Sequence, residues 1–76
     1  MNYSVESVGA RLRSLRAARH VSQQEVSDAT GIAVSSIKIY ENDRGGMGLE
    51  TAWKFADYYG IGIDQVVGRD FIAQAV

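Results

Sequence analysis

The side chains best suited to recognition chemistry lie between residues 34 and 42, where hydrogen-bond donors share one side of a predicted helix with an apolar residue. Projected at about 100° per residue, that side carries Val34, Ser35, Lys38, Ile39 and Asn42. Ser35 and Lys38 can donate to base edges or phosphates, and lysine pairs with guanine in the major groove of DNA. Ile39 either contacts a thymine methyl group or is an ordinary exposed isoleucine. The pattern is typical of a surface that reads double-stranded DNA.

The elements that must position this face are predicted to be helices. Apolar residues recur at helical spacing, no stretch sustains a strand-like alternation, and the breaks fall at glycines. The expected helices cover residues 4–19, 23–30, 34–42, 49–59 and 63–67. The sequence therefore predicts an all-α fold, a compact bundle of five short helices.

The second and third of these helices form the most informative unit. Ser22 and Glu25 have the spacing of a capping box, and Gly31 can adopt the left-handed conformation that ends a helix. A short turn then leads directly into the helix at 34–42. Val26 and Ile37 fall where two steeply crossing helices would bury them. Such a pair is a helix-turn-helix, whose second helix can enter the major groove.

Length and composition restrict the other classes of protein. The 76 residues are expected to form a single domain, with a core at 5–68 and a C-terminal tail at 69–76. With no cysteine and one histidine, the sequence predicts no metal site, no cofactor and no catalytic residue. The loop at 43–48 lacks the lysine and the serine or threonine of a phosphate-binding loop, so neither an enzyme nor a small-molecule substrate is expected.

The sequence also bears on where the protein is located and on how it could bind nucleic acid. It has neither an apolar run of about 20 residues nor a signal-peptide pattern, so we expect a cytoplasmic protein without membrane contact. Its formal net charge of −1 argues against a protein that coats nucleic acid by bulk charge. Any DNA binding must therefore come from a local face.

A longer pattern connects these elements. It consists of two segments in one register, GARLRSLRAARHVSQQEVSDATGIAVSSIKIYEND at 9–43 and LETAWKFADYYGIGIDQVVG at 49–68. In both, the sequence resembles the Cro and phage-repressor type of helix-turn-helix regulator, the Xre family. The resemblance implies a lambda-repressor-like domain of five helices, homodimers on a near-palindromic operator, and transcriptional control, with repression expected, in a bacterial or phage nucleoid.

The resemblance also assigns contacts with the DNA backbone. Gln23 matches the family residue that holds a phosphate, and its amide lies at a positive helix terminus that suits an anion. The alternative is that Gln23 is simply a polar residue of the first turn. Gln24, Asn42 and Arg44 are further candidates for phosphate contacts.

Other positions are assigned to the scaffold or depart from the family pattern. The resemblance implies that Arg16 and Glu41 form a structural ion pair between the first and third helices. Ala33 lacks the capping side chain common before the third helix, and Asp43 stands where glycine is common, with a carboxylate expected to repel phosphate. His20 is expected to end the first helix. The other arginines of that helix are expected to form a solvated face, with a binding patch as the alternative: Arg11, Arg13 and Arg19.

The C-terminal half carries the expected interaction surface. The helix at 49–59 is apolar over about 160° of its circumference, so one edge can face the core and the other a partner. We expect a homodimer interface formed by Val66, Val67, Phe71 and Ile72; the alternative is a tail folded back on its own core. A second function also stays open, that of an antitoxin-like or other protein-interaction module whose protein partner covers this apolar surface.

Overall fold

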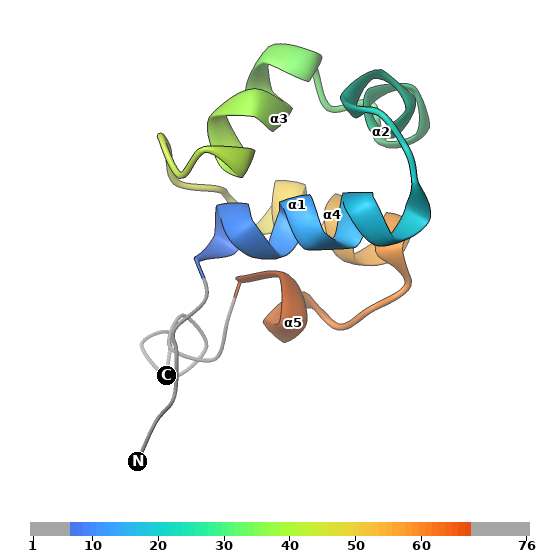
Figure 1. Ribbon diagram of the computed structural model, residues 1–76. Coiled ribbons are helices and arrows are strands. Elements are labelled where there is room, and N and C mark those ends of the chain that lie inside the picture. The colour runs from blue at the N-terminus through green and yellow to red at the C-terminus, as the bar shows by residue number, and fades with distance from the viewer. Residues whose placement is uncertain (1–6, 68–76) are drawn as a thin grey trace, which may run out of the picture.

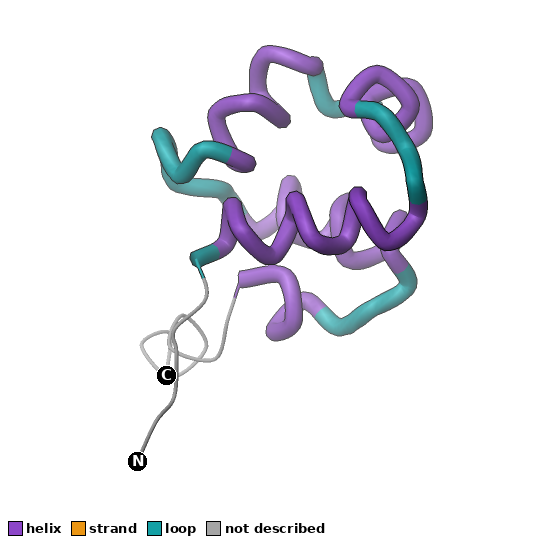
Figure 2. The backbone as a smooth tube through the Cα atoms, in the orientation of Figure 1, coloured by secondary structure: helices purple, strands orange, loops and turns teal. Residues whose placement is uncertain are grey.

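The computed structural model describes residues 7–67, and this part of the chain is built from helices alone. They are α1 (Val8–Arg19), α2 (Gln23–Thr30), α3 (Val34–Glu41), α4 (Leu49–Tyr59) and α5 (Ile63–Val67). Figure 1 shows α1 and α4 at the centre, with α2 and α3 on one side and α5 on the other. The tube in Figure 2 has no strand between residues 7 and 67. The predicted all-α fold of five helices is confirmed.

Local hydrogen bonds determine where the first helices begin. Ser7 is extended, with φ −68° and ψ 158°, and its side chain caps the helix that begins at Val8, so the predicted start at residue 4 is wrong. Ser22 Oγ accepts from the Glu25 amide at 3.0 Å, and Glu25 Oε1 accepts from the Ser22 amide at 3.0 Å. These two bonds form the predicted capping box. Ala33 supplies no side-chain cap to α3, also as predicted.

Left-handed residues end three of the helices. Gly31 after α2 has φ 79° and Gly60 after α4 has φ 67°, a conformation that glycine adopts without steric cost. His20 ends α1 with φ 57°, in the place where it was expected to end the helix. By contrast, α3 ends at Glu41 with Asn42 as its C-cap at φ −105°, so the predicted helix is one residue too long.

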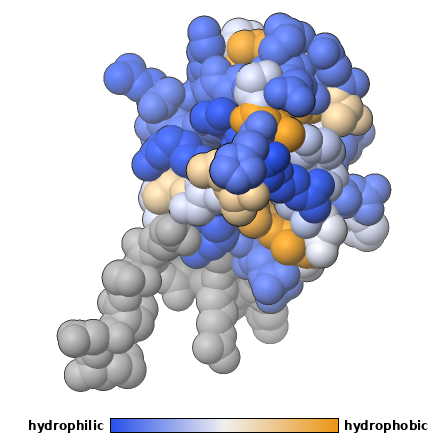
Figure 3. Space-filling model, turned by 45° about the vertical axis from the view of Figure 1, so that its right-hand side comes forward, coloured by the Kyte–Doolittle hydropathy of each residue, from blue (hydrophilic) through white to orange (hydrophobic). Residues whose placement is uncertain are grey.

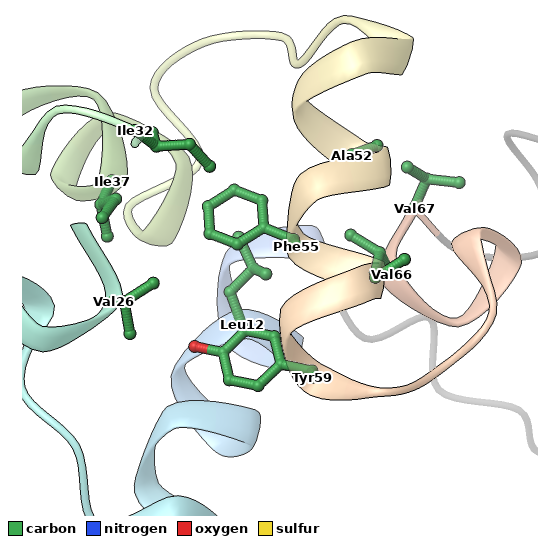
Figure 4. Packing of buried hydrophobic residues seen from close by; sticks show 10 residues of the cluster. Leu12, Val26, Ile32, Ile37, Ala52, Phe55, Tyr59, Val66 and Val67 are labelled. Carbon is green, nitrogen blue, oxygen red and sulfur yellow. The ribbon is translucent and has the colours of Figure 1, made fainter. Parts of the chain in front are cut away.

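The core lies between the central helices and the inner sides of the others (Figure 4). The ring of Phe55 meets the Tyr40 ring edge-on, with centroids 6.1 Å apart, and stacks on the Tyr59 ring at 6.4 Å. Every helix contributes to this cluster. The buried apolar side chains are Leu12, Val26, Ile32, Ile37, Ala52, Phe55, Ala56, Tyr59, Val66 and Val67.

Two residues of the expected dimer interface belong to this core. Val66 is 0% exposed and Val67 is 8% exposed, because α5 packs against α1 and α4. Side chains buried within their own chain have no surface to offer a second copy, which corrects their assignment to a dimer contact. Phe71 and Ile72, the other two residues of that assignment, lie outside the described residues.

Three arginines of α1 each donate to a backbone carbonyl at the C-terminal end of another helix. The pairs are Arg11 with Val66 at 3.3 Å, Arg13 with Glu41, and Arg19 with Tyr59 at 3.0 Å. A cation at a helix C-terminus is favourable because unpaired carbonyls concentrate partial negative charge there. Arg13 and Arg19 are exposed, as expected for a solvated face, but the hydrogen bonds to other helices were not predicted. These side chains attach α3, α4 and α5 to α1.

The face in Figure 3 is largely hydrophilic, with apolar patches between polar side chains. Three large apolar side chains within residues 7–67 are nevertheless exposed: Ile39 (43%), Leu49 (61%) and Trp53 (63%). No helix in the same range is both long enough and apolar enough to cross a membrane.

Candidate nucleic-acid interface

The turn between α2 and α3 has a defined geometry. Thr30 Oγ1 donates to the Val26 carbonyl at 2.7 Å and accepts from the Ile32 amide at 3.2 Å, so one hydroxyl connects the end of α2 to the turn. Figure 4 shows Val26, Ile32 and Ile37 directed from this unit toward Phe55 of α4. With these side chains buried, the opposite side of α3 must face solvent.

That outer side of α3 carries the residues predicted to read bases. Ser35, Lys38 and Ile39 are exposed, and Val34 at the start of the helix is half-buried. Ile37, on the inner side, is fully buried, which fixes the rotation of the helix about its axis. The structure therefore gathers two hydrogen-bond donors and an apolar side chain on one accessible face.

The loop that follows α3 packs against Ile39. The Arg44 amide donates to the Ile39 carbonyl at 2.9 Å. A Cβ atom on Gly45 would lie 2.9 Å from Ile39 Cγ2, closer than such atoms normally approach. Glycine at 45 thus lets the loop backbone lie against the isoleucine side chain. Sequence reasoning missed this contact, because nothing in the sequence distinguishes Gly45 from its neighbour Gly46.

Beneath this face, one buried carboxylate joins three helices. Arg16 of α1 donates to Glu41 of α3 through Nε at 2.8 Å and Nη2 at 3.1 Å, and Gln23 Nε2 of α2 donates to the same carboxylate at 3.0 Å. Glu41 is 3% exposed. The hydrogen bond with Glu41 raises the pKa of Arg16 above its usual value. The position of α3 is therefore tied to both preceding helices.

The side-chain amides assigned to phosphate contacts are engaged within the chain. The pairs are Gln23 with the Glu41 carboxylate, Gln24 with Asp28 Oδ1 at 2.9 Å, and Asn42 with the Lys38 carbonyl at 2.8 Å. Arg44 is exposed just beyond α3. The Gln23 and Gln24 residues occupy the N-terminal turn of α2, where backbone amides point outward along the helix axis.

The Asp43 side chain joins the end of α3 to the start of α1. The residue has φ 55°, and its Oδ1 accepts from the Gly9 amide at 2.9 Å. That hydrogen bond, together with one to the Ser7 side chain, lowers the pKa of the carboxyl group. The carboxylate is thus directed at the N-terminus of α1, where partial positive charge is favourable to it. Asp43 is also exposed, so its expected repulsion of phosphate stays a prediction.

The other basic side chains within residues 7–67 lie on or beside two different helices. Lys38 lies on α3 and Arg44 just beyond it, whereas Lys54 lies on α4. Neither the Lys38 nor the Arg44 side chain is engaged in a hydrogen bond or ion pair with residues 7–67. The arginines of α1, by contrast, are all engaged in contacts within the fold.

The fold is similar to three solved structures. The restriction-modification controller protein C.AhdI from Aeromonas hydrophila has a TM-score of 0.73 at 27% identity, over 78% of this chain and 89% of that chain. The P22 c2 repressor, solved in complex with the synthetic operator 9T, has a TM-score of 0.77 at 16% identity, over 82% and 94%. The hypothetical transcription factor NHTF from Neisseria has a TM-score of 0.74 at 15% identity, over 100% and 97%. The last two likenesses concern the fold alone.

The sequence is also similar to a curated protein, the cryptic phage CTXphi transcriptional repressor RstR of Vibrio cholerae. The two are 33% identical over 58 residues, 76% of this chain and 52% of the repressor, so the chain spans about half the length of that relative. The sequence profile of the helix-turn-helix family matches residues 12–66, which include α2, the turn and α3 in full. The chain therefore belongs to the helix-turn-helix family of DNA-binding regulators, in its Cro and phage-repressor type.

Proposed function

We propose that this protein is a sequence-specific DNA-binding regulator of transcription that acts as a repressor on bacterial or phage DNA in the cytoplasm. One observation carries the proposal: α3 exposes Ser35, Lys38 and Ile39 on one side while Ile37 holds the other side in the core. A helix presented in this way fits the major groove, which is about 12 Å wide. The repressor and controller proteins among the similar chains support the same assignment.

Four residues of α3 are proposed to contact base edges. The Lys38 ammonium is placed to donate to the O6 and N7 acceptors of guanine, and the Ser35 hydroxyl can donate or accept. Val34 and Ile39 offer apolar contacts at the start and the middle of the same face. These side chains supply the sequence preference.

Contacts with phosphate are proposed for Gln23, Gln24, Asn42 and Arg44. Ser22 caps the amide of Glu25, and the amides of Gln23 and Gln24 in the same turn are offered to a DNA phosphate at the positive end of α2. The side chain of Gln23 stays on Glu41 in this arrangement, so a phosphate bound at α2 is coupled to the position of α3.

We propose that the functional unit is a homodimer on a near-palindromic operator, with half-sites about one helical turn apart. On α4, Leu49 and Trp53 are 61% and 63% exposed. Beside Trp53 lies an open hollow of about 250 Å³, lined also by Ala56, Asp57, Ile61 and Ile63. Apolar surface rimmed by polar side chains marks an interaction site. The dimer contact is therefore proposed at the side of α4 that carries Leu49 and Trp53, and at the start of α5.

Selection of bound DNA from a random pool tests the proposal. The wild-type protein is expected to enrich one sequence with two-fold symmetry, and Lys38→Ala and Ile39→Ala to relax the preference at separate positions. Lys54→Ala, on α4, is the matched control and should keep the wild-type sequence. If the wild type enriches nothing even at low salt, the proposed function is wrong. Sedimentation showing a monomer at tens of micromolar would contradict the dimer.

A protein-interaction module of antitoxin type is a second candidate, favoured by the exposed Trp53 side chain. The two candidates differ in what Trp53→Ala does. If α4 joins two copies of this chain, the substitution weakens self-association and DNA binding together. If α4 instead receives a different protein, the substitution leaves both properties unchanged and removes binding of that protein from a co-expressed complex.

A further inference from the structure

Ile39 occupies the middle of the exposed face of α3, and its environment is unusual for a polar reading surface. It is 43% exposed, with Lys38 beside it in sequence and Ser35 one turn before it. Lys38 on α3 and Arg44 just beyond it are the cations beside this face, and the Arg13 guanidinium lies at the Glu41 carbonyl at the end of the helix. The exposed Ile39 side chain adds an apolar contact to what these polar groups offer a ligand.

The side chain of Ile39 is also held in place before any ligand arrives. A β-branched side chain in a helix is restricted to few rotamers. The loop backbone at Gly45 lies against Cγ2, and the Arg44 amide ties the loop to the Ile39 carbonyl at 2.9 Å. An apolar group that packs against the loop and has few rotamers is suited to contact one small group of matching shape.

We propose that α3 reads the C5 methyl group of a pyrimidine in the major groove through Ile39. This inference rests on the proposed function and names the chemical group that the site recognises. Thymine carries such a methyl group, and 5-methylcytosine carries one at the same ring position. Ser35 and Lys38 lie beside the contact and can form hydrogen bonds with the neighbouring base edges. Water can then be excluded from the methyl group without leaving a hydrogen-bond donor unpaired.

Replacing thymine by deoxyuridine at one operator position at a time tests the proposal, because the change removes a methyl group and leaves every hydrogen-bonding edge intact. One thymine position in each half-site is expected to respond. Replacing it by uracil should weaken binding of the wild-type protein about fourfold for each half-site changed, which is the effect of losing one buried methyl group. Ile39→Ala is expected to bind the thymine and uracil duplexes equally. Because Ile39 lies outside the core, the variant should keep the wild-type thermal transition.

A second arm distinguishes the two sources of the methyl group. At the same step, duplexes carrying cytosine or 5-methylcytosine opposite guanine are compared. A gain for 5-methylcytosine together with the loss for uracil supports methyl reading independent of the base, and binding would then respond to DNA methylation. A response in the thymine arm alone assigns the contact to thymine.

The loop supplies a matched pair of variants. In Gly45→Ala the new Cβ would lie 2.9 Å from Ile39 Cγ2 and displace the side chain, whereas nothing lies within 4 Å of a Cβ on Gly46. Gly45→Ala should therefore reduce the discrimination between thymine and uracil, and Gly46→Ala should preserve it. Sequence-specific binding that no uracil substitution weakens would overturn the inference and leave the proposed function intact. Loss of all sequence preference in the wild type would overturn the proposed function itself.

Discussion

A Cβ atom on Gly9 of α1 would lie 2.5 Å from the carbonyl oxygen of Glu41 at the end of α3. The N-terminal turn of α1 and the last residue of α3 are therefore in backbone contact. Asp43 reinforces the contact by accepting the Gly9 amide at 2.9 Å. This junction sets how far the C-terminal end of α3 stands from the rest of the fold.

Gly9→Ala is expected to destabilise the protein by about 1–3 kcal/mol, the usual effect of overpacking, despite the gain of about 1 kcal/mol that alanine brings to a helix. The clash is with backbone atoms, which cannot rotate away. Urea denaturation followed by circular dichroism measures the change. Gly46→Ala, in open space, is the control and should unfold like the wild type. Equal stability of both variants would show that the junction can relax.

Glu41→Ala is expected to cost about 3 kcal/mol, the low end for a broken buried ion pair, since the Arg16 side chain is 26% exposed. The substitution strands the guanidinium and leaves the Gln23 side chain without its acceptor. Replacing both partners, by Arg16→Met with Glu41→Leu, should cost less than Glu41→Ala alone. A double-mutant cycle measured in urea gives the coupling, and a value under about 0.5 kcal/mol would contradict the pairing.

Stability should fall at high pH because of Tyr59. Burial, helped by the nearby Glu41 carboxylate, raises the pKa of Tyr59 to about 12 from an ordinary 10.0. The unfolded chain loses this proton near pH 10 while the folded chain retains it. The stabilisation is therefore complete below pH 10 and is lost as pH rises toward 12, by about 2 kcal/mol. Tyr59→Phe should flatten this part of the stability profile; an unchanged profile would assign the decline to other groups.

DNA binding should depend only moderately on salt. Each neutralised phosphate contributes about −0.9 to the slope of log K against log salt concentration. Arg44 is the cation proposed to contact phosphate, so a dimer with two such contacts should give a slope of about −1.8. Arg44→Ala should bring the slope close to zero, and Lys54→Ala should leave it unchanged. Titrations at several salt concentrations test this, and equal effects of the two substitutions would argue for non-specific attraction.

The helices and their order were predictable because the signals that define them are local. Ser22 and Glu25 are three residues apart, and Gly31 directly follows the helix that it ends. The contacts that hold the candidate site were not predictable, because they join distant residues. Asp43, for example, accepts a hydrogen bond from Gly9, which lies 34 residues earlier in the chain.

The same limit applies to the arginines of α1. In sequence they form an ordinary charged helix face, because their carbonyl partners lie up to 55 residues away. Trp53 is an apolar example. The sequence places it in a wide apolar arc of the helix and does not show whether it packs inward. In the structure, α4 is rotated so that Ala52 and Phe55 face the core, which leaves Trp53 exposed.

The two sides of α3 have separate duties. Ile37 and Glu41 are held by the core and by Arg16, whereas Ser35 and Lys38 make no side-chain contact that the fold requires. The outward residues can therefore be exchanged as a set, and a new target sequence acquired, with little loss of stability. Substitutions on the outer side of α3 can thus alter which DNA sequence the protein recognises, while the core side of the helix and the fold stay the same.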